Sequence, residues 1–138
     1  MHAELAAPQP RVLIIEDEAL IAEELRGRLS RLGFRVIGAV DSADEGVAIA
    51  TKERPDVVLM DIRLRGEKDG VQAAREIRQQ VDLSIVYLSA HSDQRTVERA
   101  KQTDHDGFLL KPFHRSDLQA TLEIAIRRQA LRAKERQA

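Results

Sequence analysis

Asp61 directly follows the apolar run at residues 57–60, and it is the most informative residue of the chain. A run of this kind, bounded upstream by Pro55, is typical of a buried strand in a parallel sheet, and ligands gather at the carboxyl ends of such strands. Three other apolar runs also end in charged or hydroxyl side chains, which are Glu16 and Asp17, Ser89, and Lys111. Each of these alone would be read as a cap, an acidic helix turn or a solvated lysine. Their recurrence at the ends of different strands favours a shared site.

Acids, a hydroxyl and an ammonium gathered at one place suit the transfer of a phosphoryl group. Several carboxylates in a small pocket lose hydration and repel one another, so the pocket needs a counter-charge. Oxygen ligands without histidine or cysteine favour a hard cation, and Mg²⁺ fits best because it leaves room for water and phosphate oxygens. Lys111 can meet a phosphoryl group, and Ser89 can donate a hydrogen bond to it. The chemistry inferred is transfer of a phosphoryl group onto Asp61, followed by its hydrolysis.

An alternation of strands and helices would bring these side chains together. Short apolar runs predict five strands, which are residues 12–15, 34–40, 57–61, 84–88 and 107–110. Between and after them, apolar residues recur at helical spacing. This order predicts an α/β fold, a doubly wound five-stranded parallel sheet with helices on both faces. Right-handed crossovers then place the carboxyl ends of all strands along one edge.

Local signals predict where several helices begin and end. Residues 42–45 read Ser-Ala-Asp-Glu, which has the form of a capping box and opens the second helix; that helix ends before Pro55. Gly33 is expected to end the first helix. Ser92 is the expected cap of the fourth helix, whose apolar face is thin, so this helix is expected to be the least firmly held.

The composition excludes several classes of protein. The chain has 138 residues, of which 43% are hydrophobic and 33% charged, and it has no cysteine, so disulfides, thiolate zinc sites and cysteine nucleophiles are excluded. This composition fits a reducing cytoplasm, where we expect the protein. A net charge of −1 gives no general attraction to nucleic acid or to a membrane, and no apolar stretch is long enough to cross a bilayer. We therefore expect neither as a partner.

The chain is expected to hold one domain, at residues 11–128. Residues 1–10 contain no apolar run of a secretory signal, and we expect them to form a disordered tail. Residues 129–138 are expected to extend the last helix or to form the stub of a linker.

The motifs around the candidate site resemble the receiver domain of bacterial two-component response regulators. They are Ile-Ile-Glu-Asp-Glu at residues 14–18, Leu-Met-Asp at 59–61, Leu-Ser-Ala at 88–90 and Phe-Leu-Leu-Lys-Pro-Phe at 108–113. The resemblance covers residues 11–128. It implies a flavodoxin-like receiver fold with strand order 2-1-3-4-5, an order for which a receiver is a standard example.

The resemblance also implies a role for each residue. Asp61 matches the phosphoacceptor aspartate, Ser89 the switch hydroxyl and Lys111 the phosphate-binding lysine. The implied Mg²⁺ ligands are Asp17 directly, Glu16 through water, Asp61, and the backbone carbonyl of Arg63. The switch aromatic matches Phe108, where tyrosine is more frequent, and Ser89 stands where threonine is more frequent. Arg63 and His91 lie two residues after Asp61 and Ser89, positions that flank the phosphoryl group, so they are expected to modulate its lifetime.

The expected function is that of a phosphoacceptor in a phosphorelay, with no enzyme activity beyond self-catalysed phosphoryl transfer and autodephosphorylation. The implied donor is a sensor histidine kinase or a histidine phosphotransfer protein. Phosphorylation is expected to move Ser89 toward the phosphoryl group, to let Phe108 enter the vacated space, and so to change the face made by the fourth helix, fifth strand and last helix. An output partner would bind that face. A second copy of the chain is a further candidate partner.

Three alternatives stay open. The chain could be a receiver excised from a larger regulator or hybrid kinase. It could be a phosphatase of the haloacid-dehalogenase type, but that family usually has a second acid where Arg63 stands. It could also be a degenerate receiver that serves as a docking module, but all five chemical positions are filled.

Overall fold

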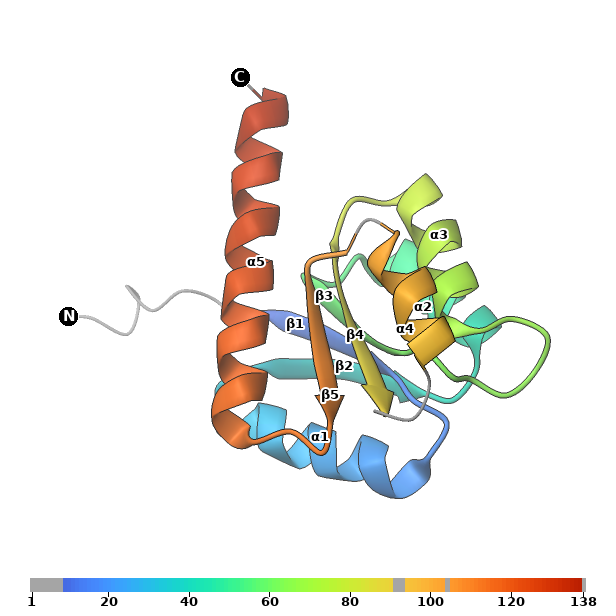
Figure 1. The fold of residues 1–138 in the computed structure, drawn as a ribbon. Helices are drawn as coiled ribbons and strands as arrows, with labels where there is room; N and C mark the ends of the chain where they lie inside the picture. Colours follow the sequence, from blue (N-terminus) through green and yellow to red (C-terminus); the bar gives the residue numbers. More distant parts are fainter. Residues whose placement is uncertain (1–8, 91–93, 104, 138) are drawn as a thin grey trace.

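The computed structural model describes residues 9–90, 94–103 and 105–137 of the chain (Figure 1). Within them, strands and helices alternate in the predicted order. The elements are β1 (Arg11–Ile15), α1 (Ala19–Arg31), β2 (Arg35–Val40), α2 (Ala43–Glu53), β3 (Val57–Asp61), α3 (Gly70–Gln80), β4 (Ser84–Ala90), α4 (Gln94–Lys101), β5 (Gly107–Lys111) and α5 (Arg115–Gln137). No helix in these ranges has both the length and the hydropathy needed to span a bilayer.

The five strands form one parallel sheet in the order β2-β1-β3-β4-β5, which confirms the predicted fold class and strand order. Helices α1 and α5 pack on one face of the sheet, and α2, α3 and α4 pack on the other (Figure 1). Val57 and Leu59 of β3 belong to the core with α1 and α5, whereas Val58 and Met60 belong to the core on the other face. Because both faces of β3 are covered, its apolar run is continuous and fully buried.

The predicted helix signals act where the sequence placed them. The Ser42 hydroxyl accepts a hydrogen bond from the Glu45 amide at 3.2 Å and begins α2. Arg54, with φ of 48°, ends α2 in the left-handed conformation just before Pro55. Gly33, with φ of 95°, lies just after α1.

The predicted end segments are only partly described. Residues 1–8, Ser92 and His91 lie outside the described residues, so the disordered tail and the cap of α4 stay predictions. The Pro10 carbonyl, within the predicted tail, accepts a hydrogen bond from the Arg35 amide at 2.8 Å. Helix α5 continues as one helix through Gln137.

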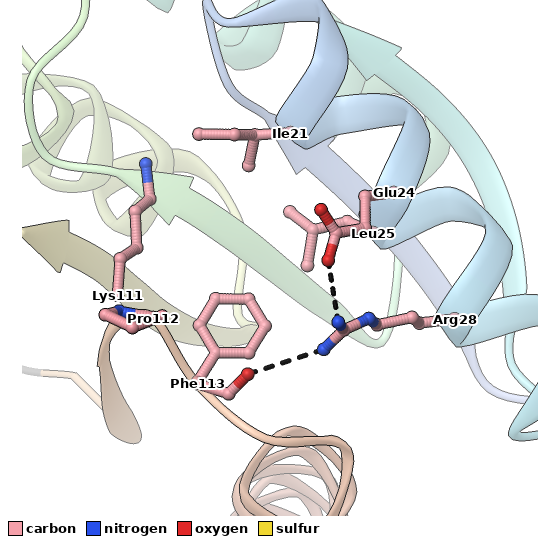
Figure 2. Close-up of a pocket in the computed structure, with 7 residues that line it drawn as sticks. All are labelled: Ile21, Glu24, Leu25, Arg28, Lys111, Pro112 and Phe113. Carbon is pink, nitrogen blue, oxygen red and sulfur yellow. Dashed lines mark hydrogen bonds and ion pairs between the residues drawn. The ribbon is translucent and has the colours of Figure 1, made fainter.

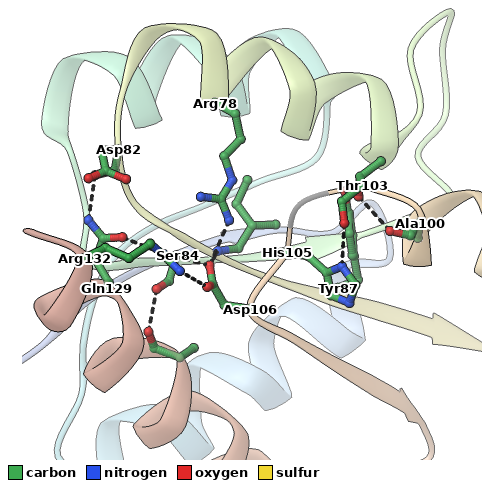
Figure 3. A network of polar contacts seen from close by, with 12 residues as sticks. Arg78, Asp82, Ser84, Tyr87, Ala100, Thr103, His105, Asp106, Gln129 and Arg132 are labelled. Atoms are coloured by element: carbon green, nitrogen blue, oxygen red, sulfur yellow. Dashed lines mark hydrogen bonds and ion pairs between the residues drawn. The ribbon is translucent and has the colours of Figure 1, made fainter. Parts of the chain in front are cut away.

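A buried carboxylate, Asp106, joins the last turns of α5 to the rest of the domain (Figure 3). Arg132 of α5 donates to it at 2.5 Å, Arg78 of α3 at 2.8 Å and the Ile85 amide of β4 at 3.1 Å. Burial alone would raise the pKa of Asp106, but the bonds from Arg132 and Ile85 and the charge of Arg78 hold that pKa below its usual range. Gln129 adds a bond to the Asp82 carbonyl at 3.2 Å. The helix end is therefore attached to the domain.

Candidate functional site

The three predicted acids and the predicted lysine meet at the carboxyl edge of the sheet. Glu16 and Asp17 follow β1, Asp61 is the last residue of β3, and Lys111 is the last residue of β5. One carboxylate oxygen from each acid lies within 4.8 Å of the other two. The Lys111 Nζ lies 2.8 Å from Glu16 Oε1 and 3.5 Å from Asp61 Oδ2. The strand order of the sheet, with β1 beside β3, explains this convergence.

The backbone around Asp61 is held by the first residue of α3, Gly70. Its amide donates to the Ile62 carbonyl at 2.7 Å. A Cβ at position 70 would lie 2.2 Å from the Asp61 carbonyl oxygen, so only glycine allows α3 to begin this close to β3. Asp69 caps the same helix in a capping box with Gln72. Gly70 thus positions Asp61, a role that no motif in the sequence indicates.

The charges of the site depend strongly on one another. Burial, followed by the adjacent Glu16 carboxylate, raises the pKa of Asp61 to about 7. Burial would also raise the pKa of Glu16, but hydrogen bonds with Asp61, Lys111 and the Glu18 amide lower it instead. For Lys111, burial opposes the charged form, but the hydrogen bond to Glu16 and the charges of both acids raise its pKa. Without a metal ion, the repulsion between the Glu16 and Asp61 carboxylates therefore favours a proton on Asp61.

The segment after β3, residues 62–69, closes one side of the site, and we call it the β3–α3 loop. The Arg63 amide donates to Asp61 Oδ1 at 3.1 Å. The Arg65 amide donates to Asp17 Oδ2 at 3.1 Å, and Arg65 Nε lies 3.5 Å from the same oxygen. The backbone of this loop therefore orients two of the three carboxylates.

Ser89 and Phe108 lie on β4 and β5 and make other contacts. Ser89 is buried in β4, one residue beyond the Leu88 that pairs with Asp61, and its hydroxyl donates to the Ala90 carbonyl at 3.1 Å. Phe108 of β5 is half-buried, and its ring centroid lies 6.2 Å from that of Tyr87 and 6.3 Å from that of His105. His91 lies outside the described residues.

A pocket of about 400 Å³ adjoins the site on the side of α1 (Figure 2). It lies between α1 and the segment that follows β5, with Ile21 on one wall and Lys111 and Phe113 on the other. Arg28 pairs with Glu24 at 2.7 Å and donates to the Phe113 carbonyl at 3.4 Å, which links the two walls. Leu20, at the start of α1, is 86% exposed. An open and largely apolar pocket therefore lies next to Lys111 at the carboxyl edge of the sheet.

The donor set fits a hard divalent cation. Glu16, Asp17 and Asp61 offer three carboxylate oxygens in close proximity, and carboxylate oxygens are the protein ligands that Mg²⁺ prefers. Two of these acids are buried, so they cannot all ionise without a nearby positive charge. These three residues would hold the ion, which would supply charge neutralisation beside Asp61.

Curated proteins similar to this chain are transcriptional regulators. The chain is 40% identical over 126 residues to the transcriptional regulatory protein PdtaR of Mycobacterium tuberculosis, covering 91% of this chain and 60% of PdtaR. It is 36% identical over 117 residues to the KDP operon transcriptional regulatory protein KdpE of Escherichia coli, covering 85% of this chain and 51% of KdpE. The chain thus spans about half to three-fifths of the length of these relatives.

Solved structures similar to this one include receiver domains. The signal receiver domain of a modulated diguanylate cyclase from Desulfovibrio desulfuricans G20 is 38% identical, with a TM-score of 0.84, covering 90% of this chain and 98% of that one. The receiver domain of the sensor histidine kinase PA1611 from Pseudomonas aeruginosa PAO1 is 34% identical, with a TM-score of 0.78, covering 86% and 98%. That structure has a magnesium ion coordinated in its active site cleft.

Residues 12–123 match the family described as the response regulator receiver domain. This range contains every residue of the acidic and basic group at the sheet edge, and the strand order agrees with the fold expected for that family. The chain therefore belongs to the family of response regulator receiver domains of two-component systems.

Proposed function

We propose that this chain accepts a phosphoryl group on Asp61, with Mg²⁺ bound by Glu16, Asp17 and Asp61, as one step of a phosphorelay. The observation that carries the proposal is the Lys111 ammonium between two acids, 2.8 Å from Glu16 and 3.5 Å from Asp61. The magnesium ion in the similar PA1611 receiver supports the choice of metal. The backbone carbonyl of Arg63 stays a proposed further ligand.

The transfer follows from the groups at the site. An Asp61 carboxylate oxygen attacks the phosphorus of a phosphohistidine on the partner, the phosphorus–nitrogen bond breaks, and the imidazole keeps the electron pair. Lys111 and the Ser89 hydroxyl would donate hydrogen bonds to the phosphoryl oxygens. When bound, Mg²⁺ neutralises charge between the carboxylates and the phosphoryl group. Because neutral Asp61 is a poor nucleophile, a cation that favours its ionised form also favours transfer.

Hydrolysis would reset the domain. Water attacks the phosphorus of the acyl phosphate, the bond to Asp61 breaks, and inorganic phosphate leaves. Arg63 and His91 are the proposed modulators of this step. The Arg63 amide, which donates to Asp61 Oδ1 at 3.1 Å, supports a place for that residue beside the reacting group.

The proposed output is a change of the face formed by α4, β5 and α5. Ser89 would exchange its bond to the Ala90 carbonyl for one to the phosphoryl group, and Phe108 would move into the space that Ser89 leaves. Phe108 is half-buried rather than locked in the core, which supports this movement. An output partner gains affinity only if it distinguishes the two states of the face.

A histidine kinase or a histidine phosphotransfer protein is the proposed donor, and the pocket beside Lys111 is its proposed docking place. The exposed Leu20 and the apolar wall of the pocket offer surface that a partner can bury while its phosphohistidine reaches Asp61. Three further predictions are kept as proposals: that the chain is the receiver of a larger regulator or hybrid kinase, that it forms a homodimer, and that it is located in the cytoplasm.

Mass spectrometry of the chain with acetyl phosphate tests the proposed function. Mg²⁺-dependent labelling with up to one phosphoryl group per chain is expected, and Asp61→Asn should abolish it. Continued labelling of that variant to the same extent would reject Asp61 as the acceptor. Multiple turnover of a phosphomonoester such as p-nitrophenyl phosphate would favour the phosphatase alternative. Failure to bind beryllofluoride with Mg²⁺ would favour a degenerate docking module.

A further inference from the structure

We propose that Arg65 sets the affinity of the site for its divalent cation, because its guanidinium places a competing positive charge on Asp17. This inference rests on the proposed Mg²⁺ site and adds a residue that controls it. Neither the alternation of strands and helices nor the receiver motifs assign a role to Arg65.

The contact between Arg65 and Asp17 has two parts. The Arg65 amide donates to Asp17 Oδ2 at 3.1 Å, and the guanidinium Nε lies 3.5 Å from the same oxygen. The amide orients the carboxylate, whereas the guanidinium adds charge. Lys111 also adds a positive charge to the site, 2.8 Å from Glu16. Three carboxylates therefore face two cations before any metal ion arrives.

The β3–α3 loop is held in place by contacts that do not involve the Arg65 side chain. Lys68 pairs with Asp44 of α2 at 3.1 Å and with Glu76 of α3 at 2.6 Å. Asp69 pairs with Arg99 of α4 at 2.9 Å. The Arg65 amide should thus stay on Asp17 when the side chain is changed, so a substitution tests the charge and not the loop position.

A metal ion that binds Asp17 must displace this guanidinium or bind beside it. Either event costs free energy, through the lost ion pair or through repulsion between two cations. The Arg65 side chain is 84% exposed, so water screens its charge, and the effect is that of a surface ion pair. Removing the guanidinium should tighten Mg²⁺ binding by roughly two- to fivefold.

The test is a titration of the full chain with MgCl₂ at constant ionic strength. Binding is monitored through the NMR chemical shifts of the backbone amides at positions 17 and 65. Arg65→Gln should lower the Mg²⁺ dissociation constant by roughly two- to fivefold, and Arg65→Lys, which keeps the charge, should lie closer to the original value. Arg127→Gln is the matched control, since it removes an exposed charge on α5 beside Pro10, near the amino end of β1. It should leave the constant unchanged.

Varying the ionic strength distinguishes an electrostatic effect of the Arg65 side chain from a steric one. The difference between Arg65→Gln and the unaltered chain should shrink in high salt, because surface charges are screened there. An unchanged or larger dissociation constant for Arg65→Gln at low salt would overturn the inference. If the unaltered chain shows no saturable Mg²⁺ binding at all, the proposed metal site itself is wrong, which is a different outcome.

Discussion

Replacing Asp61 by asparagine is expected to stabilise the metal-free fold. Glu16 and Asp61 are both buried, and burial, followed by the adjacent Glu16 carboxylate, raises the pKa of Asp61 to about 7, so a proton on Asp61 relieves their repulsion. An asparagine amide carries no charge, and it can donate a hydrogen bond to Glu16 in place of that proton. The substitution thus removes a repulsion and keeps the contact.

The expected magnitude follows from this pKa. A carboxyl group with a pKa of 3.8 in the unfolded chain and about 7 in the fold opposes folding by roughly 4 kcal/mol when it is ionised in both states. Water at the edge of the site lets the ionised form relax, so we expect a gain of about 2 kcal/mol. Because the folded pKa is raised, stability falls as the pH rises from 3.8 through about 7. The gain from Asp61→Asn should thus be largest above pH 7 and smaller near pH 5.

Urea unfolding in EDTA, near pH 5 and near pH 8, measures this difference. Glu123→Gln is the matched control, since it neutralises an exposed acid on α5 and should change the free energy of unfolding by less than about 0.5 kcal/mol. Added Mg²⁺ should narrow the gap near pH 8, because it stabilises the chain that keeps all three carboxylates. The reasoning is refuted if Asp61→Asn is no more stable than the original chain near pH 8, or if its gain is independent of pH.

Three further substitutions test other parts of the structure. Gly70→Ala should lower the free energy of unfolding by about 2 kcal/mol or more, measured by urea unfolding, because the new Cβ meets the Asp61 carbonyl. Asp106→Asn should lower it by about 3 kcal/mol at neutral pH, since it leaves Arg78 and Arg132 facing an uncharged group. Because the pKa of Asp106 is lowered, this loss should fade as the pH falls below 3.8, and a loss of equal size in acid would contradict it. Leu20→Glu should slow transfer from a phosphohistidine donor by about tenfold and leave labelling by acetyl phosphate unchanged; equal slowing of both would place Leu20 in the chemistry instead.

Residues at the strand ends could be predicted because their positions follow from the topology alone. Once the apolar runs are read as parallel strands, right-handed crossovers place Glu16, Asp61 and Lys111 at one edge. No side-chain contact has to be known. The burial of β3 on both faces could also be predicted, because the apolar run has no polar residue before Asp61.

Residues in the β3–α3 loop could not be predicted in this way. The contact between Arg65 and Asp17 joins positions that are 48 residues apart, and it depends on the path of an irregular segment. The sequence gives only a weak indication for Gly70, which is a glycine that follows Asp69 at the start of a helix. Its close approach to the Asp61 carbonyl could not be predicted, because that approach depends on how α3 packs on β3. Loop geometry depends on local backbone angles such as the φ of 106° at Gly66, which hydrophobic periodicity does not encode.

The end of α5 is held by an ion pair between a polar helical segment and a buried acid, Asp106. Residues 129–137 offered no apolar face strong enough to decide between a helix and a linker. In the structure, Arg132 reaches Asp106, which lies 26 positions earlier and is only 4% exposed. A buried carboxylate without a partner would strongly oppose folding. The arginine neutralises the acid and the acid holds the helix against the domain, so the extension is stabilised by an ion pair rather than by apolar burial.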